Sequence, residues 1–268
     1  MDKIAFTGGL SVEVTRRCNM QCAHCLRGEM ENADLPAGTI NLLLPYVENI
    51  DSLTLTGGEP SIALEQVDDV INSIKAAKTP IYSFYCVTNG KAEMLPFAQR
   101  MLELNSYCIQ CGGETDCCGV ALSKDRYHED IPKEHEMILR GLAAFRKDKF
   151  QTGKKNYLLK MGRAAGLADA SIEFIPDCSN REKEIQGLSP DDIDVFENSN
   201  GDTVFAIDKA MALTVNGDIL SRADYEYDDI EDIIIGNVKD MSAVINQIKW
   251  IVSEEGSKPW KATPVILP

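Results

Sequence analysis

The chain has 268 residues, of which 44% are hydrophobic, and carries a formal net charge of −15. Its apolar runs are far shorter than the roughly 20 residues that span a bilayer, and residues 1–6 lack the apolar stretch of a secretory signal. The acidic charge argues against a broad phosphate-binding surface. We therefore expect a cytoplasmic globular protein that binds neither nucleic acid nor membranes.

The first two-thirds of the chain alternates β-rich segments with segments of helical periodicity. Strands are predicted at residues 11–15, 52–56, 81–88, 119–123, 156–160 and 171–175, and helices at 40–47, 64–77, 94–104 and 132–147. Repeated β-α units predict an α/β fold with a parallel sheet and outer helices, either open or curled into a barrel. In such barrels the chemistry lies at the carboxyl ends of the strands.

The pattern changes after about residue 185. Residues 189–202 are polar and read as a linker. Two short β-rich segments then flank Asn216-Gly217, which predicts a hairpin over residues 211–222 with a type I′ turn. Residues 242–253 are predicted as a final helix. We therefore divide the chain into a core, residues 1–185, and a C-terminal extension, residues 186–268.

Three cysteines follow the first predicted strand closely, in the segment Cys18-Asn19-Met20-Gln21-Cys22-Ala23-His24-Cys25. Nine cysteines in a chain of cytosolic character indicate reduced thiols or metal ligands rather than disulfides. Three thiolates on a four-iron cluster leave one iron open for a small molecule. Two alternatives remain: a zinc site with His24 as fourth ligand, which is awkwardly placed to close a tetrahedron, and accidental spacing, expected in about one such chain in a hundred.

This cysteine triad resembles the signature of the radical S-adenosylmethionine (radical SAM) superfamily. A second motif, Thr56-Gly57-Gly58-Glu59-Pro60, follows the next predicted strand. It is similar to the glycine-rich motif with which the family contacts the amino group of the bound methionine portion. The resemblance covers about residues 11–175 and is sharp at these two motifs. It implies a partial (β/α)6 barrel, similar to a TIM barrel, with the C-terminal hairpin and helix as a small extension.

Weaker matches extend the resemblance to further cofactor-binding residues. His24 stands where the family usually has an aromatic residue near the adenine, with a plain loop residue as the alternative. Asn89 ends the third strand, and Ser123 and Asp125 resemble a segment that reaches the ribose, with a helix cap as the alternative. Arg163 in Met161-Gly162-Arg163-Ala164 is implied to pair with the methionine carboxylate, with a solvated arginine as the alternative.

The resemblance implies an oxidoreductase with a [4Fe-4S] cluster on Cys18, Cys22 and Cys25. In this family the cluster reductively cleaves S-adenosylmethionine to a 5′-deoxyadenosyl radical, and a flavodoxin- or ferredoxin-type protein donates the electron. The C-terminal hairpin resembles the SPASM extension of peptide-modifying members without its cysteines, so a peptide or protein is the first substrate expected. Small-molecule biosynthesis, activation of a glycyl radical enzyme and a non-enzymatic iron–sulfur interaction protein remain alternatives.

The remaining cysteines allow a second metal site. Cys108, Cys111, Cys117 and Cys118 cluster before and at the start of the fourth predicted strand. Small buried or loop thiols are the alternative. Cys86 and Cys178 read as core or loop residues.

Overall fold

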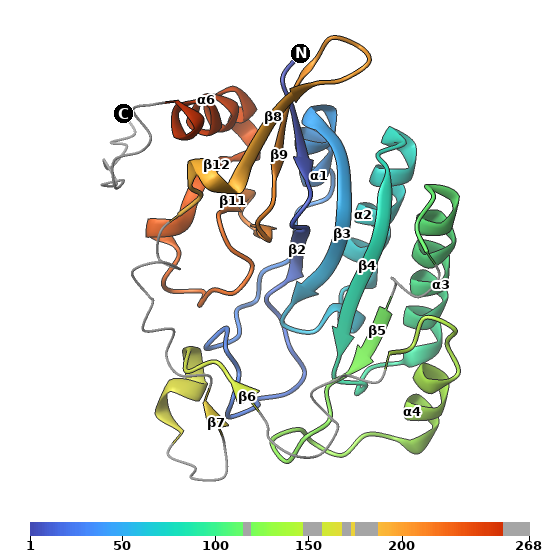
Figure 1. Ribbon diagram of the computed structural model, residues 1–268. Coiled ribbons are helices and arrows are strands. Elements are labelled where there is room, and N and C mark those ends of the chain that lie inside the picture. The colour runs from blue at the N-terminus through green and yellow to red at the C-terminus, as the bar shows by residue number, and fades with distance from the viewer. Residues whose placement is uncertain (115–118, 147–156, 168–172, 175–186, 254–268) are drawn as a thin grey trace.

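The computed structural model describes residues 1–114, 119–146, 157–167, 173–174 and 187–253. Figure 1 shows a central sheet with helices packed along one face. The strands of this sheet are β1 (Lys3–Phe6), β2 (Leu10–Thr15), β3 (Val47–Gly57), β4 (Ile81–Thr88), β5 (Gly119–Leu122), β8 (Ile193–Glu197), β9 (Thr203–Ile207), β10 (Met211–Leu213), β11 (Asp218–Leu220) and β12 (Ile234–Asn237). The α-helices are α1 (Thr39–Leu43), α2 (Leu64–Ala77), α3 (Met94–Gln110), α4 (Lys133–Arg140) and α6 (Met241–Val252). None of these described helices is long and apolar enough to cross a membrane.

The sheet is mostly parallel. Strands β2, β3, β4 and β5 pair side by side in that order and all in parallel. Helix α2 connects β3 to β4, and α3 connects β4 to β5. Antiparallel pairs join β8 to β9, β10 to β11 and β11 to β12. The predicted α/β class with a parallel sheet and outer helices is therefore confirmed.

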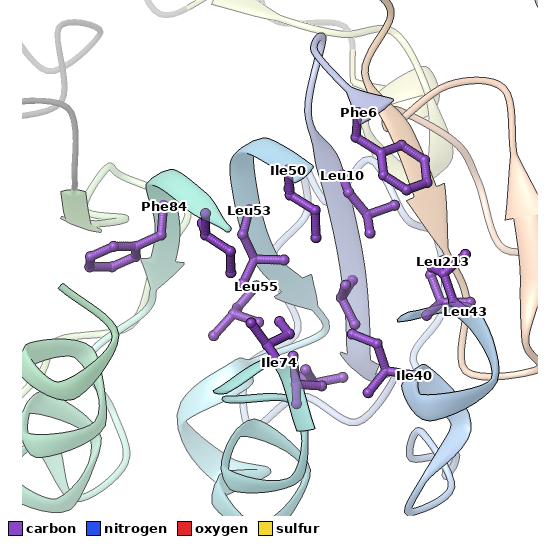
Figure 2. Close-up of a cluster of buried hydrophobic side chains, with 14 of the residues drawn as sticks. Phe6, Leu10, Ile40, Leu43, Ile50, Leu53, Leu55, Ile74, Phe84 and Leu213 are labelled. Atoms are coloured by element: carbon purple, nitrogen blue, oxygen red, sulfur yellow. The ribbon is translucent and has the colours of Figure 1, made fainter. Parts of the chain in front are cut away.

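Alternation along the strands separates an apolar face from a polar one. In β2, Leu10, Val12 and Val14 belong to the main hydrophobic core, and the intervening Ser11 and Glu13 point to the other face. Figure 2 shows Leu10, Leu53 and Leu55 of adjacent strands, with Ile74 of α2 and Ile40 of α1 in the same cluster. The helices thus cover the apolar face, and the polar face is left for the functional site.

Two short consecutive strands lie end to end along one edge of the long strand β3. Strand β1 pairs with the first half of β3 and β2 with the second half, so β1 and β2 lie along one edge of β3. Strands β9 and β10 continue this pattern, in parallel with β1 and β2 respectively. The C-terminal region therefore adds strands to the same sheet. The boundary predicted near residue 185 lies outside the described residues and stays a prediction.

Helix and strand bounds match the prediction where the periodicity is strong, as in α2 and β4. Helix α1 is shorter than predicted because a 3₁₀ turn with Pro45 near its start occupies Leu44–Tyr46, and Val47 already belongs to β3. The fifth and sixth predicted strands correspond to β6 (Tyr157–Leu158) and β7 (Glu173–Phe174), which pair in parallel as a separate two-stranded sheet.

Two details of the C-terminal region were predicted wrongly. The segment 189–202 is not a linker, because it contains β8, which pairs with β9 along five residues. The hairpin of β10 and β11 is confirmed, but its turn is not type I′, which needs positive φ at two residues. Only Gly217 has positive φ there, at 85°, and its amide donates to Thr214 O at 2.9 Å. Helix α6 is confirmed.

Candidate functional site

A cavity of about 580 Å³ lies at the carboxyl ends of the parallel strands. Eleven of the twelve predicted site residues line it: Cys18, Cys22, His24, Cys25, Gly57, Gly58, Glu59, Pro60, Asn89, Ser123 and Arg163. Asp125 is the exception and contacts the cavity through His24. Residues from five separate segments thus meet at one place, as expected for a barrel-type site.

The three cysteines lie on one loop and are partly exposed. The loop is held by its own backbone, since Cys25 N donates to Cys22 O at 3.2 Å and Gly28 N donates to Cys25 O at 3.4 Å. Burial raises the pKa of the Cys18 thiol and so favours its neutral form. A bound cation would act in the opposite direction and favour the thiolate. Three thiols converging on one cavity are a donor set that fits an iron–sulfur cluster with one open iron.

The glycine motif braces the start of this loop. Gly58 N donates to Thr15 O at 2.7 Å, and Glu59 N donates to Arg17 O at 2.9 Å. A Cβ on Gly58 would stand 2.1 Å from Arg17 O, closer than van der Waals contact allows. The close approach that glycine permits here is therefore to the chain's own backbone, one residue before Cys18.

Glu59 is buried and accepts four hydrogen bonds. Its Oε1 accepts from Ser61 N at 3.0 Å, from Ser61 Oγ at 2.6 Å and from Thr88 Oγ1 at 2.6 Å, and its Oε2 accepts from Asn89 N at 2.7 Å. Burial raises the pKa of Glu59, and these hydrogen bonds oppose that shift. The carboxyl group ties the end of β4 to the motif that follows β3.

Asn89 extends this connection to the cysteine loop. Its Nδ2 donates to Asn19 Oδ1 at 2.8 Å and lies 3.9 Å from Cys18 Sγ. A hydrogen bond to a ligating sulfur is a contact that stabilises and tunes a cluster. Asn89 therefore contacts Cys18 and also lines the cavity.

Asp125 holds two histidines, one of which the sequence did not indicate. Its Oδ1 lies 2.8 Å from His128 Nδ1 and accepts from Tyr127 N at 2.8 Å, and its Oδ2 lies 3.2 Å from His24 Nε2. Burial favours the neutral acid, but the hydrogen bonds from His128 and Tyr127 outweigh it and lower the pKa of Asp125. The carboxylate is therefore already engaged with His128, Tyr127 and His24.

His24 and His128 both line the cavity. The ring of His24 stacks on Tyr127 at a centroid distance of 4.9 Å. Burial lowers the pKa of His24. For His128, hydrogen bonds to Asp125 and Cys22 outweigh burial and raise the pKa to about 9. The available signal was the spacing of Asp125 and His128, three residues apart in the loop after β5, in a chain with three histidines.

Arg163 approaches the site through a tight backbone contact. Its amide donates to Cys25 O at 2.9 Å. Gly162 has φ 54°, and a Cβ there would stand 2.5 Å from Leu26 O and 2.6 Å from Cys25 O. Figure 1 shows the loop after β2 beside the segment that carries β6. The Arg163 guanidinium is 3.7 Å from the exposed carboxylate of Glu29, so this ion pair is weak and leaves its charge for a ligand.

A further wall of the cavity was not predicted. It consists of Arg16, Arg27 and the C-terminal residues Ala223, Asp224 and Tyr227. Arg27 donates from Nη1 to Tyr225 O and from Nη2 to Ala223 O, both at 3.0 Å. Contacts between residues some 200 positions apart leave no pattern in the sequence.

The other described cysteines do not line this cavity. Cys86 is fully buried in β4, as predicted for a core residue, and its burial raises the pKa of its thiol. Cys108 is buried on α3, and Cys111 is the partly exposed residue that ends that helix. Cys117, Cys118 and Cys178 lie outside the described residues, so a second metal site stays a prediction.

Fold and site together define an α/β protein with a cysteine-lined cavity at the carboxyl edge of its sheet. No family model matches the sequence. A stretch of 66 residues is 29% identical to the uncharacterized protein MJ0907 of Methanocaldococcus jannaschii, and it covers 24% of this chain and 23% of that protein. The match thus spans less than a quarter of either chain.

Two solved structures are similar to this chain over most of its length. Native anSMEcpe with bound AdoMet and Cp18Cys peptide is 12% identical, with a TM-score of 0.49 over 93% of this chain and 82% of that chain. Streptococcus suis SuiB bound to precursor peptide SuiA is 12% identical, with a TM-score of 0.43 over 94% of this chain and 66% of that chain.

Proposed function

We propose that this protein is a radical SAM enzyme whose cluster is held by Cys18, Cys22 and Cys25. The observation that carries the proposal is the meeting of three thiols of one loop with the glycine motif, Asn89 and Arg163 around a single cavity. A zinc site on the same loop would need His24 as its fourth ligand, and the position of His24 between Cys22 and Cys25 is awkward for closing a tetrahedron.

Different residues of the chain are proposed to hold the cluster and S-adenosylmethionine. Cys18, Cys22 and Cys25 would bind three irons of a [4Fe-4S] cluster and leave the fourth for the amino and carboxylate groups of S-adenosylmethionine. When bound, this pair supplies the reductive cleavage that gives a 5′-deoxyadenosyl radical. The protein orients the cofactor and keeps water away from it.

Arg163 is the residue best placed to bind the methionine carboxylate. It lines the cavity and its amide donates to Cys25 O, so its guanidinium would lie near a cluster held by the cysteine loop. Its Nε is buried and makes no hydrogen bond to any residue described here. A carboxylate is the geometric match for a guanidinium. The backbone of Gly57-Gly58 and Pro60 is proposed to line the amino-group side.

The adenosine end is assigned to His24, Ser123 and Asp125. His24 and Ser123 line the cavity directly. Asp125 is proposed to act through His24, because its carboxylate is bonded to both imidazoles.

A peptide is the proposed substrate, and a flavodoxin- or ferredoxin-type protein is the proposed electron donor. The support for a peptide is the C-terminal hairpin, which resembles the SPASM-type extension and continues the sheet beside the site. The cysteines of such extensions do not occur after residue 178. We expect this extension to contact substrate without binding a cluster.

Cofactor cleavage tests the proposal. Anaerobically reconstituted protein, reduced in the presence of S-adenosylmethionine, is expected to release 5′-deoxyadenosine. The Arg163→Met variant should bind S-adenosylmethionine more weakly and keep its iron. A protein that binds iron but releases no 5′-deoxyadenosine would refute the enzymatic role.

A further inference from the structure

The wall formed by Arg16 and the C-terminal segment contains buried polar groups to which the proposed cofactor binding assigns no role. Arg16 is 4% exposed and Tyr227 is 6% exposed, and both line the cavity. Arg16 Nη2 and the Tyr227 hydroxyl make no hydrogen bond within the part of the chain that the structure describes. A buried donor without an acceptor destabilises a fold, so such groups in a cavity wall indicate a ligand that completes them.

The surrounding contacts hold this wall in place. Arg16 donates from Nε to Glu13 Oε2 at 3.1 Å and from Nη1 to both oxygens of Glu31, at 3.0 and 2.9 Å. Its guanidinium lies 4.4 Å from the centre of the Tyr227 ring, and Tyr227 N donates to Arg27 O at 3.1 Å. The second terminal nitrogen of Arg16 is therefore presented in a fixed direction, beside the cysteine loop.

The charge of the wall decides what kind of acceptor fits. Arg16 and Arg27 contribute two positive charges, against the three carboxylates of Glu13, Glu31 and Asp224. Arg16 is already neutralised by its two glutamates, so the wall together with these glutamates carries a small negative excess. A further carboxylate would meet this excess in a partly buried site, where repulsion is strong. A neutral acceptor meets no such repulsion.

We propose that this wall is a substrate subsite that binds an amide carbonyl oxygen of a peptide through Arg16 Nη2 and the Tyr227 hydroxyl. The inference rests on the proposed function, because it places the substrate beside the same open cluster position. A carbonyl accepts two hydrogen bonds and carries no net charge, which suits the two donors and the charge of the wall. Peptide backbones offer such carbonyls at every residue.

A matched pair of small probes tests the acceptor class. N-acetylglycinamide is neutral, and N-acetylglycinate has the same skeleton but ends in a carboxylate. Ligand-observed NMR titration of reconstituted protein is expected to show tighter binding of the amide. Tighter binding of the carboxylate, or no binding of the amide at millimolar concentration, would overturn the proposal.

Matched variants test the residues. Tyr227→Phe and Arg16→Lys are expected to weaken binding of N-acetylglycinamide about threefold to tenfold, the range for one lost hydrogen bond. Lysine keeps a positive charge for Glu13 and so protects the fold. Tyr225→Phe is the control, because Tyr225 is also buried in the same segment but does not line the cavity. Equal loss in Tyr225→Phe, or no loss in Tyr227→Phe, would overturn the assignment.

Iron content and 5′-deoxyadenosine release, measured on the same samples, separate the two proposals. Amide binding that is retained in protein without cofactor cleavage refutes the enzymatic role alone. If S-adenosylmethionine is cleaved normally and both variants bind N-acetylglycinamide as tightly as the unchanged protein, the subsite alone is refuted.

Discussion

Replacing Glu59 by Gln tests the connection between the glycine motif and the end of β4. The four hydrogen bonds to the Glu59 carboxylate are 2.6 to 3.0 Å long, and all their donors belong to Ser61, Thr88 and Asn89. Glutamine keeps an oxygen for the donors at one end, but its NH₂ group faces a donor at the other. At least one buried donor then loses its acceptor, which costs about 1–3 kcal/mol.

The remaining bonds in Glu59→Gln also lose their charge assistance, about 1 kcal/mol in all after relief of the buried charge. We expect a total loss of about 2–4 kcal/mol in the free energy of unfolding. For a chain of this size that is a fall in Tm of roughly 5–15 °C.

Thermal unfolding followed by circular dichroism measures the effect. Glu65→Gln is the control, since Glu65 is exposed in the first turn of α2 and its loss should cost at most about 1 kcal/mol. Equal melting temperatures for the two variants would refute the reasoning, because the Glu59 hydrogen bonds would then contribute nothing net.

The packing predicts the effects of three further substitutions on stability and iron content. Gly162→Ala should lower iron retention and stability, because its Cβ would stand 2.5 Å from Leu26 O. Gly166→Ala is the control and should lower neither, since nothing lies within 4 Å of a Cβ there. Equal iron contents in the two variants would contradict the importance of the Gly162 contact. Leu55→Ala should cost about 2–5 kcal/mol in denaturant unfolding, because Leu55 is fully buried. Cys86→Ala should leave the iron content unchanged, and a loss of iron would show that this core thiol is a ligand.

The elements that depend on local pattern could be predicted from the sequence. Helix α2 and strand β4 have the expected bounds because their apolar residues recur regularly. Strand β8 was missed because four of its five residues are exposed and its sequence, Ile-Asp-Val-Phe-Glu, lies within a polar segment. Its structure comes from pairing with β9, and such tertiary pairing is invisible to local propensity.

The same distinction holds in the site. Cys18, Cys22 and Cys25 were predicted because a compact loop brings nearby residues together. His128 was missed, since its partner His24 is about a hundred residues away and the contact depends on Asp125. The three-residue spacing of Asp125 and His128 was the only local signal, because the contact with His24 depends on the finished fold.

At the C-terminal hairpin, the sequence motif predicted the hairpin but not the type of its turn. Asn216-Gly217 did mark a hairpin, but the backbone placed only the glycine at positive φ. A four-residue turn closed by Gly217 gave the strands the register that their buried faces require.

Iron content after anaerobic reconstitution tests the proposed cluster most directly. The protein with all three loop thiols is expected to bind about four irons per chain. The variant with Cys18, Cys22 and Cys25 all changed to alanine is expected to bind none while keeping its fold. Native protein without iron, or a triple variant with undiminished iron, would contradict the assignment of these thiols as ligands.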